Sequence, residues 1–230
     1  MKSLKKERVS IMVADAIKEI IVTENLKSGD RLYSENQLSK KLEVSRSSIR
    51  EAVRMLEVTG LVKVYQGKGV FISEPSEVGL PMKRWVIDNI ELLREHFEIR
   101  LLLEPHAASV AADRATVQDV EVLRNGYQMF CDYVHQGEVL KAIAGDSEFH
   151  LKIAAITKNK TLHVLMRTMA KSLNESWIVS LYTPGRLECT VIEHGKVLQA
   201  VSEHQADRAA EEMRKHLNNA VKDIKEYIDE

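Results

Sequence analysis

Four residues in the second half of the chain could together bind a metal ion. Asp146 and His150 are four positions apart in GDSEFHLKIAAI, so they share one face of a predicted helix. A carboxylate and an imidazole at this spacing can hold a divalent cation. His194 and His216 lie on two later segments of helical period, and their rings would converge if those helices pack antiparallel. The chain has eight histidines, so spacing alone leaves surface or core histidines as the ordinary alternative.

A second group of side chains, nearer the N-terminus, has the types and spacing that contact DNA. Ser45 can cap a helix whose apolar positions recur with helical period, namely Ile49, Ala52, Val53 and Leu56. Burying that face turns Arg46, Ser47 and Arg50 outward at the start of the helix. Arginine there can bind guanine edges or phosphate, and serine can bind phosphate oxygens. The alternative is a small helical domain with a solvated face.

The elements around this group follow the pattern of a winged helix-turn-helix over residues 34–73. Ser34 and Gln37 can form a capping box at the start of the first of its helices. The segments LVKVY and VFIS are predicted to pair as a hairpin, whose tip includes Gln66, Gly67 and Lys68. A basic tip of this kind can enter a minor groove. An amphipathic segment over residues 7–24, ahead of these two helices in the chain, predicts one more helix in the domain.

The rest of the chain has a different composition. EPSEVGLP predicts a linker, and beyond it apolar residues recur with helical period almost throughout. We expect helices at 81–89, 91–112, 116–136, 138–156, 160–182, 186–203 and 205–228. Helices joined by such short loops predict an antiparallel bundle, and Pro105 falls where it can kink the second of them. The chain is thus predicted to be mainly α, with a winged helix-turn-helix domain (1–75), a linker (76–82) and an all-α bundle (83–230).

Composition and charge agree with a DNA-binding protein. The chain has 230 residues, 29% of them charged, and no apolar run near the ~20 residues that span a bilayer. Cys131 and Cys189 are isolated, which is typical of a reducing cytoplasm. Residues 1–75 hold fourteen Lys and Arg against ten Asp and Glu, whereas the whole chain has a net charge of −1. The basic excess therefore accompanies the predicted recognition helix.

The run LYSENQLSKKLEVSRSSIREAVRMLEVTGLVKVYQGKGVFI is similar to the DNA-binding domain of the GntR family of bacterial transcription regulators, over about residues 6–74. We take ten residues as candidate DNA contacts: Ser34, Asn36, Ser45, Arg46, Ser47, Ser48, Arg50, Gln66, Gly67 and Lys68. The chain departs from the family at Tyr33, where Pro is usual, and at Asn36, where Arg is usual. Asn36 can still form hydrogen bonds, so we expect DNA binding with a different half-site.

The later segments resemble the FCD effector domain of the FadR branch of this family, over about residues 83–225. The resemblance lies in ELLREHFEIRLLLEPHAASVAADRAT, DSEFHLKIAAITKNKTL, EHGKVLQAV and AAEEMRKHL. Many members bind a divalent metal through one Asp and three His, and those positions correspond to Asp146, His150, His194 and His216. Zinc, nickel and manganese all tolerate such a ligand set.

The resemblance also implies a place for an effector. Arg100 matches an arginine that the family often points into the cavity, where it could pair with a carboxylate. The alternative for Arg100 is a salt bridge to Glu104, one helical turn along. Asn174 and Trp177 could line the same cavity.

We therefore expect a cytoplasmic, metabolite-responsive transcription regulator, a repressor that binds a palindromic operator as a homodimer. It is expected not to be an enzyme. Two alternatives stay open at this point: a metal-dependent hydrolase fused to a DNA-binding module, and a regulator with a purely structural metal and no effector. No motif places a general base for the hydrolase.

Overall fold

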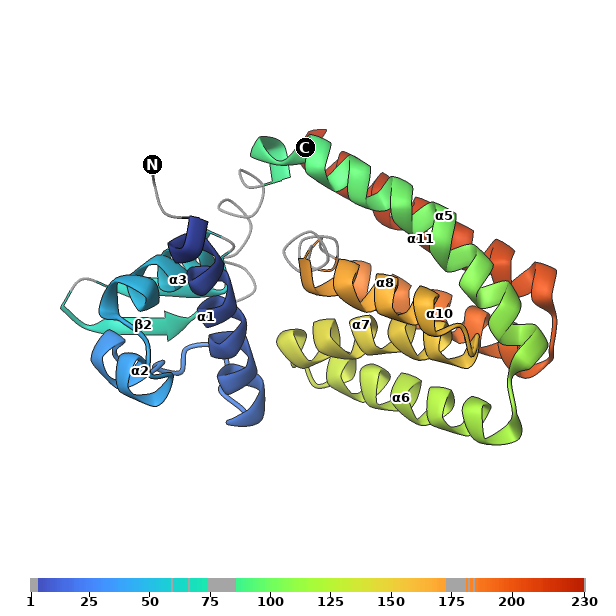
Figure 1. The fold of residues 1–230 in the computed structure, drawn as a ribbon, viewed down its shortest axis with the longest axis horizontal. Coiled ribbons are helices and arrows are strands. Elements are labelled where there is room, and N and C mark those ends of the chain that lie inside the picture. The colour runs from blue at the N-terminus through green and yellow to red at the C-terminus, as the bar shows by residue number, and fades with distance from the viewer. Residues whose placement is uncertain are drawn as a thin grey trace. The chain divides into compact units, whose positions relative to one another are not determined.

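The computed structural model of the protein describes residues 4–58, 60–65, 67–73, 86–172, 181, 183 and 185–229. The chain divides into two compact units, Met1–Asp88 and Asn89–Glu230 (Figure 1). Helices dominate both, and a two-stranded hairpin belongs to the first. The predicted fold class is thereby confirmed. The predicted linker, 76–82, lies outside the described residues.

The N-terminal unit is a three-helix domain with a hairpin. Its elements are α1 (Leu4–Thr23), α2 (Glu35–Lys41), α3 (Arg46–Val58), β1 (Val62–Tyr65) and β2 (Gly69–Ile72). The two strands are antiparallel, with Val62 opposite Ile72, and Arg31 forms an isolated bridge to Phe71. Helix α3 packs on both α1 and α2. Their contact faces supply fully buried side chains that include Ile17, Leu38, Ile49 and Leu56.

Local hydrogen bonds fix the ends of the helices in this unit. The predicted capping box of α2 is present: the Ser34 hydroxyl accepts from the Gln37 N–H at 3.3 Å, and the Gln37 side chain accepts from the Ser34 N–H at 2.9 Å. Gly60, with φ of 73°, follows α3 in a left-handed conformation that favours glycine. The Leu61 N–H then returns to the Leu56 carbonyl at 2.8 Å, which closes the end of α3.

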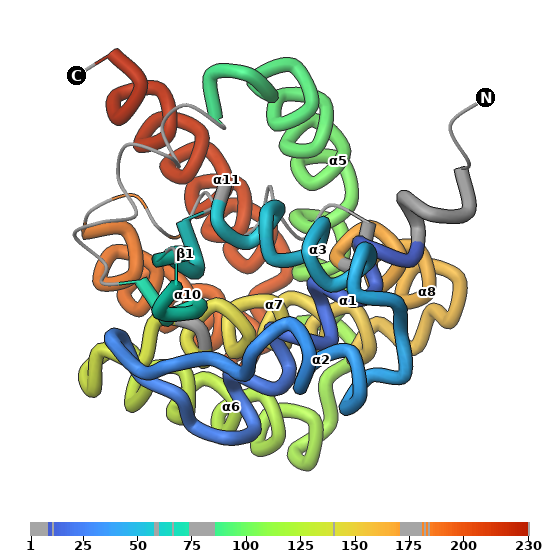
Figure 2. Tube along the Cα trace, turned by 90° about the vertical axis from the view of Figure 1, so that its left-hand side faces the viewer, coloured from blue at the N-terminus to red at the C-terminus, as the bar shows by residue number. Residues whose placement is uncertain are grey.

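The second unit is a bundle of antiparallel helices. Within the described residues, its helices are α5 (Ile90–Arg114), α6 (Val117–His135), α7 (Val139–Ile156), α8 (Lys160–Ser172), α10 (Arg186–Ser202) and α11 (Ala206–Asp229). Helix α5 lies along α11, and α6 lies along α7 (Figure 2). Helix α5 continues through Pro105. The helix predicted over 160–182 is described as far as Ser172.

Small residues bring the helices of the bundle close together. On α5, four alanines are fully buried: Ala107, Ala108, Ala111 and Ala112. Side chains this small let neighbouring helices approach the α5 backbone closely, and α5 packs along α11. Where α10 meets α6, a Cβ atom at Gly195 would lie 2.8 Å from the Tyr127 hydroxyl. That hydroxyl donates to the Val191 carbonyl at 3.0 Å, so α10 is fixed next to the position of His194.

Candidate metal centre and nucleic-acid interface

The four predicted metal ligands meet inside the bundle. Asp146 and His150 come from α7, His194 from α10 and His216 from α11. Each offers one ligand atom, and the four atoms lie within 4.8 Å of one another. All four side chains are buried. Spacing along the sequence left these residues as one possibility, and the resemblance to the FCD domain assigned all four; the fold brings them together.

The spacing of the ligand atoms fits one divalent ion. Nε2 of His194 lies 3.2 Å from Nε2 of His150 and 3.4 Å from Oδ1 of Asp146. Ligand atoms about 2.1 Å from a metal stand roughly 3–3.4 Å from their neighbours in octahedral or tetrahedral geometry. Imidazole nitrogens and a carboxylate oxygen are also the donors that such ions take in proteins. Nε2 of His150 and Oδ1 of Asp146 stand farther apart, at 3.9 Å, so the donors suit a metal and the ligand atoms would close slightly around it.

Aromatic packing holds His194 in this position. The Phe149 ring stacks on the His194 ring, with centroids 4.0 Å apart and planes 14° apart. Phe130 packs on His194 from a centroid distance of 5.4 Å. Because these rings restrict rotation of the imidazole, its Nε2 atom stays directed at His150 and Asp146.

Two glutamates that sequence reasoning did not assign to the site lie behind two of the histidines. Oε2 of Glu104 is 2.5 Å from Nδ1 of His150, and Oε2 of Glu193 is 2.8 Å from Nδ1 of His216. In each ring, Nδ1 is therefore occupied and Nε2 remains for a metal. Metal-binding histidines commonly give their second nitrogen to a carboxylate in this way. Glu193 immediately precedes His194, but nothing in the sequence links it to His216.

Both glutamates are ionised by their surroundings. Burial alone would raise the pKa of Glu104, but the Arg100 guanidinium and His150 hold that pKa below its usual value. Burial likewise opposes ionisation of Glu193, yet its hydrogen bonds with His216 and Arg186 bring its pKa to about 2. The site thus contains carboxylates that accept hydrogen bonds at neutral pH.

Two histidines of the site, His194 and His216, favour the neutral form. Burial lowers the pKa of His194 well below its ordinary value, and the nearby His216 and His150 add to this effect. Burial also lowers the pKa of His216, by more than its hydrogen bond to the Glu193 carboxylate raises it. A neutral imidazole is the form that binds a metal, so these rings need not lose a proton first.

Arg100 forms the salt bridge that the sequence had left as an alternative to effector binding. Its Nε atom lies 2.6 Å from Oε1 of Glu104, with both side chains buried. The guanidinium also lies 5.2 Å from the centre of the Phe97 ring. Arg100 is therefore connected through Glu104 to His150. Asn174 and Trp177, the other predicted effector contacts, lie outside the described residues.

The predicted DNA contacts are mostly on the surface of the N-terminal unit. Seven are exposed: Asn36, Ser45, Arg46, Ser47, Arg50, Gly67 and Lys68. Ser34 is half-buried and caps α2. Ser48 is buried, and its hydroxyl lies 2.9 Å from the Ser45 hydroxyl, so it supports the start of α3 and does not face outward. Gln66 lies outside the described residues.

Arg50 connects the recognition helix to the helix before it. Its Nη2 atom lies 3.1 Å from Oε2 of Glu35, at the first residue of α2. The Arg50 side chain is 58% exposed, and an ion pair this exposed contributes little to stability. Arg50 can therefore exchange Glu35 for a phosphate or a base without unfolding the domain.

Comparison with known protein families agrees with this two-part organisation. The profile described as "Bacterial regulatory proteins, gntR family" matches residues 10–72, and that of the FCD domain matches residues 95–219. The chain belongs to the GntR family of bacterial regulatory proteins and carries an FCD domain. The resemblance read from the sequence is confirmed.

Individual relatives named as transcription regulators align with this chain over most of their length. The HTH-type transcriptional regulator LutR of Bacillus subtilis is 29% identical, over 89% of this chain and 96% of its own. The Uxu operon transcriptional regulator of Escherichia coli K12 is 30% identical, over 94% of this chain and 86% of its own. The solved structure of Streptococcus agalactiae GntR has a TM-score of 0.50 and 29% identity, covering 92% of this chain and 98% of its own.

These relatives define the coarse function. The chain is a transcriptional regulator with a DNA-binding domain, and it is not an enzyme. The hydrolase alternative is accordingly set aside. None of the helices that the structure describes is both long and apolar enough to cross a membrane.

Proposed function

We propose that this regulator is a cytoplasmic repressor that binds a palindromic operator as a homodimer and responds to a small carboxylate metabolite. Its helical domain would bind one divalent metal ion through four residues: Asp146, His150, His194 and His216. The observation that carries the proposal is the burial of these four residues with their ligand atoms within 4.8 Å of one another.

The proposed ligand set leaves room for an effector. Four protein atoms do not fill the six positions that zinc, nickel and manganese can use, so a carboxylate can take one of those remaining. When bound, such an ion would act as a fixed positive charge that attracts the effector's carboxylate. We also place Arg100 in the effector site, where its guanidinium, which carries five N–H donors, would pair with the carboxylate while it keeps its salt bridge to Glu104. We place Asn174 in the same effector site.

The homodimer follows from the DNA-binding domain. One such domain has a modest basic excess and one recognition helix, α3, so it would read only half of an operator. Two copies joined by their helical domains would read both halves of a palindrome, which turns two weak contacts into specific binding. The exposed Asn36 would contribute to the choice of half-site.

The proposed response is a shift between two arrangements of the dimer. An effector can weaken operator binding only by its different affinity for the DNA-bound and free forms. A relative at 26% identity is the Glc operon transcriptional activator of Escherichia coli, so repression needs its own test. A reporter gene behind the operator should rise when this regulator is deleted, and a fall would mean activation.

The effector is tested on the operator complex. Small carboxylates are added to operator-bound protein, loaded with zinc or treated with chelator, and release is followed by fluorescence anisotropy. The proposal expects at least one carboxylate to release the zinc-loaded protein and not the chelated protein. Equal release of both, or release by none of a broad panel, favours the alternative in which the metal is structural and there is no effector.

A further inference from the structure

A charged cluster behind His216 has no role in the function proposed so far. Arg186, the first residue of α10, has only 1% of its side chain exposed. Its Nη1 atom lies 3.2 Å from Oε1 of Glu193 and 3.0 Å from Oδ2 of Asp223. Stability alone does not account for such a cluster. Burying charged groups costs the free energy of their hydration, and apolar side chains of the same size would fill the space without that cost.

The cluster meets the proposed metal site at one ring nitrogen. Nδ1 of His216 lies 2.8 Å from Oε2 of Glu193 and 3.1 Å from Nη2 of Arg186. A carboxylate can only accept a hydrogen bond, whereas a guanidinium can only donate one. Glu193 therefore favours the tautomer with hydrogen on Nδ1, and Arg186 favours the tautomer with hydrogen on Nε2. Only the first leaves Nε2 with the lone pair that a metal needs.

The surrounding contacts favour Glu193 in this competition. Arg186 has other acceptors, since Nη2 also contacts Glu193 and lies 3.4 Å from the His216 main-chain oxygen. Asn219 donates to Oε1 of Glu193 at 2.7 Å, and this leaves Oε2 directed at the imidazole. Arg186 and Asn219 thus hold the carboxylate in the orientation in which it accepts from Nδ1 of His216.

The same arrangement recurs at His150 but not at His194. Glu104, paired with Arg100 on α5, reaches Nδ1 of His150 from another helix. Nδ1 of His194, in contrast, has no hydrogen-bond partner within the part of the chain that the structure describes. Two of the three imidazoles therefore have a carboxylate held by a guanidinium, and the third is held by aromatic packing.

Building on the proposed metal site, we propose that Glu193, held by Arg186 and Asn219, is a positioning residue that fixes His216 in its metal-binding tautomer. Glu104 has the matching role toward His150. The Arg186 cluster thereby connects α10 to α11 at the metal site. Its energetic cost is offset by a preorganised ligand, because His216 need not change tautomer when the metal binds.

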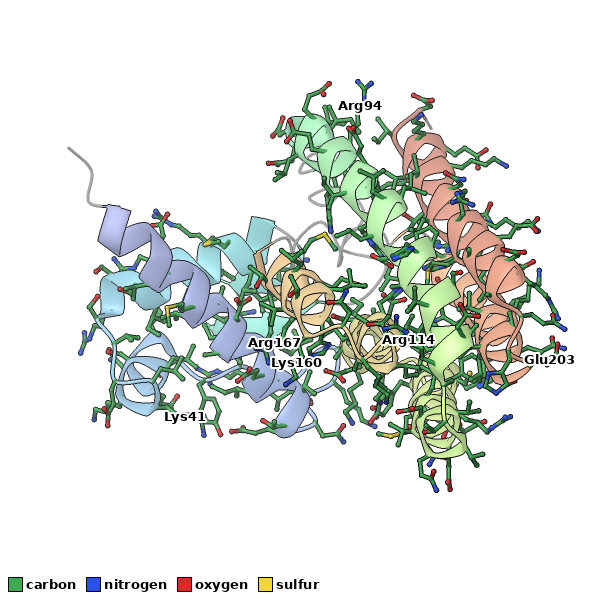
Figure 3. The ribbon with its side chains drawn as sticks, turned by 45° about the vertical axis from the view of Figure 1, so that its right-hand side comes forward. Lys41, Arg94, Arg114, Lys160, Arg167 and Glu203 are labelled. Atoms are coloured by element: carbon green, nitrogen blue, oxygen red, sulfur yellow. The ribbon has the colours of Figure 1, made fainter. Side chains whose placement is uncertain are left out.

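Zinc affinity of the full chain tests this role. Glu193→Gln keeps the size of the side chain and its capacity to pair with Asn219, but removes the charge that opposes donation by Arg186. Loss of such a partner typically weakens metal binding about 10- to 100-fold, and we expect an effect in this range from competition with a chelator. The matched control is Glu203→Gln at the other end of α10. Glu203 points away from the bundle and pairs with the exposed Arg208 (Figure 3), so its loss should leave zinc affinity unchanged.

Nitrogen NMR of the histidine rings in the metal-free protein gives a readout that does not depend on stability. The wild type should show hydrogen on Nδ1 of His216, and Glu193→Gln should shift the population toward Nε2. A wild type with hydrogen on Nε2, or a Glu193→Gln protein that binds zinc as tightly as wild type, overturns the positioning role. A wild type that binds no zinc refutes the metal site itself, so the two failures are distinguishable.

Discussion

Nε2 of His150 and Nε2 of His194 face each other at 3.2 Å inside the bundle. Two neutral imidazoles in this arrangement either share one hydrogen or direct both lone pairs at a common cation. Glu104 lies against Nδ1 of His150, and a neutral ring that donates Nδ1–H to this carboxylate has its lone pair on Nε2. A cation between the rings would satisfy both nitrogens and the nearby Asp146 carboxylate at once.

Removal of one ligand should empty the metal site. We expect purified wild-type protein to contain a divalent metal, and His150→Ala to bind it more weakly by at least ~100-fold, since a direct ligand matters more than its supporting partner. His163→Ala, on α8 and outside the cluster, is the control and should keep its metal. Elemental analysis after reconstitution decides: a His150→Ala protein with its full metal content contradicts the site.

Metal should also stabilise the fold. An ion that binds only the folded protein adds stability by mass action, about 2.7 kcal/mol at a hundred times its dissociation constant. Chelator should therefore lower the melting temperature of the wild type but not that of His150→Ala. His150→Ala should still bind operator DNA, because the recognition helix is in the other domain. An identical effect of chelator on both proteins would show that it does not act through this site.

The recognition helix should account for specific DNA binding. Arg46 and Arg50 are exposed at the start of α3, and loss of a bidentate arginine–guanine pair costs ~1–3 kcal/mol. Arg46→Ala or Arg50→Ala should weaken operator binding about tenfold or more. Arg94→Ala is the control, because Arg94 is an exposed arginine of the helical bundle (Figure 3). Unchanged operator affinity in both α3 variants would remove this helix from the proposed interface.

The wing should contribute to affinity with little effect on sequence preference. Lys68 is exposed next to Gly67, in the turn between β1 and β2. If Lys68 contacts phosphate, or is attracted by the negative potential of the groove, Lys68→Ala should weaken binding to all sequences similarly. The slope of log affinity against log salt concentration should then fall in magnitude by about 1. Titrations of operator and random duplexes at several salt concentrations measure this effect. A loss confined to the operator would instead indicate base contact by Lys68.

Local relationships were predictable from the sequence, and contacts between distant helices were not. The Ser34–Gln37 capping box and the Asp146–His150 pair depend on spacings of three and four residues within one helix, so sequence alone indicates them. Glu193 and His216, however, lie on different helices, and only the packing of α10 on α11 brings them together. Ser48, which the serine pattern placed among the candidate DNA contacts, is buried by packing of the helices, and spacing along the chain does not indicate that burial.

The last prediction concerns acid stability and a buried histidine outside the metal cluster. His96 on α5 is 2% exposed, and burial, assisted by the nearby Arg100 charge, lowers its pKa to about 3. The unfolded chain binds a proton on this ring near pH 6.5, whereas the folded chain does not, so stability falls as pH drops below 6.5. Between pH 7 and 5.5 this one group should remove about 1.3 kcal/mol. His96→Leu should lose correspondingly less stability over that range, and His106→Leu, at an exposed position of the same helix, should behave as wild type. Urea unfolding in the presence of chelator measures the difference, and equal acid sensitivity of the wild type and His96→Leu would contradict a neutral buried His96.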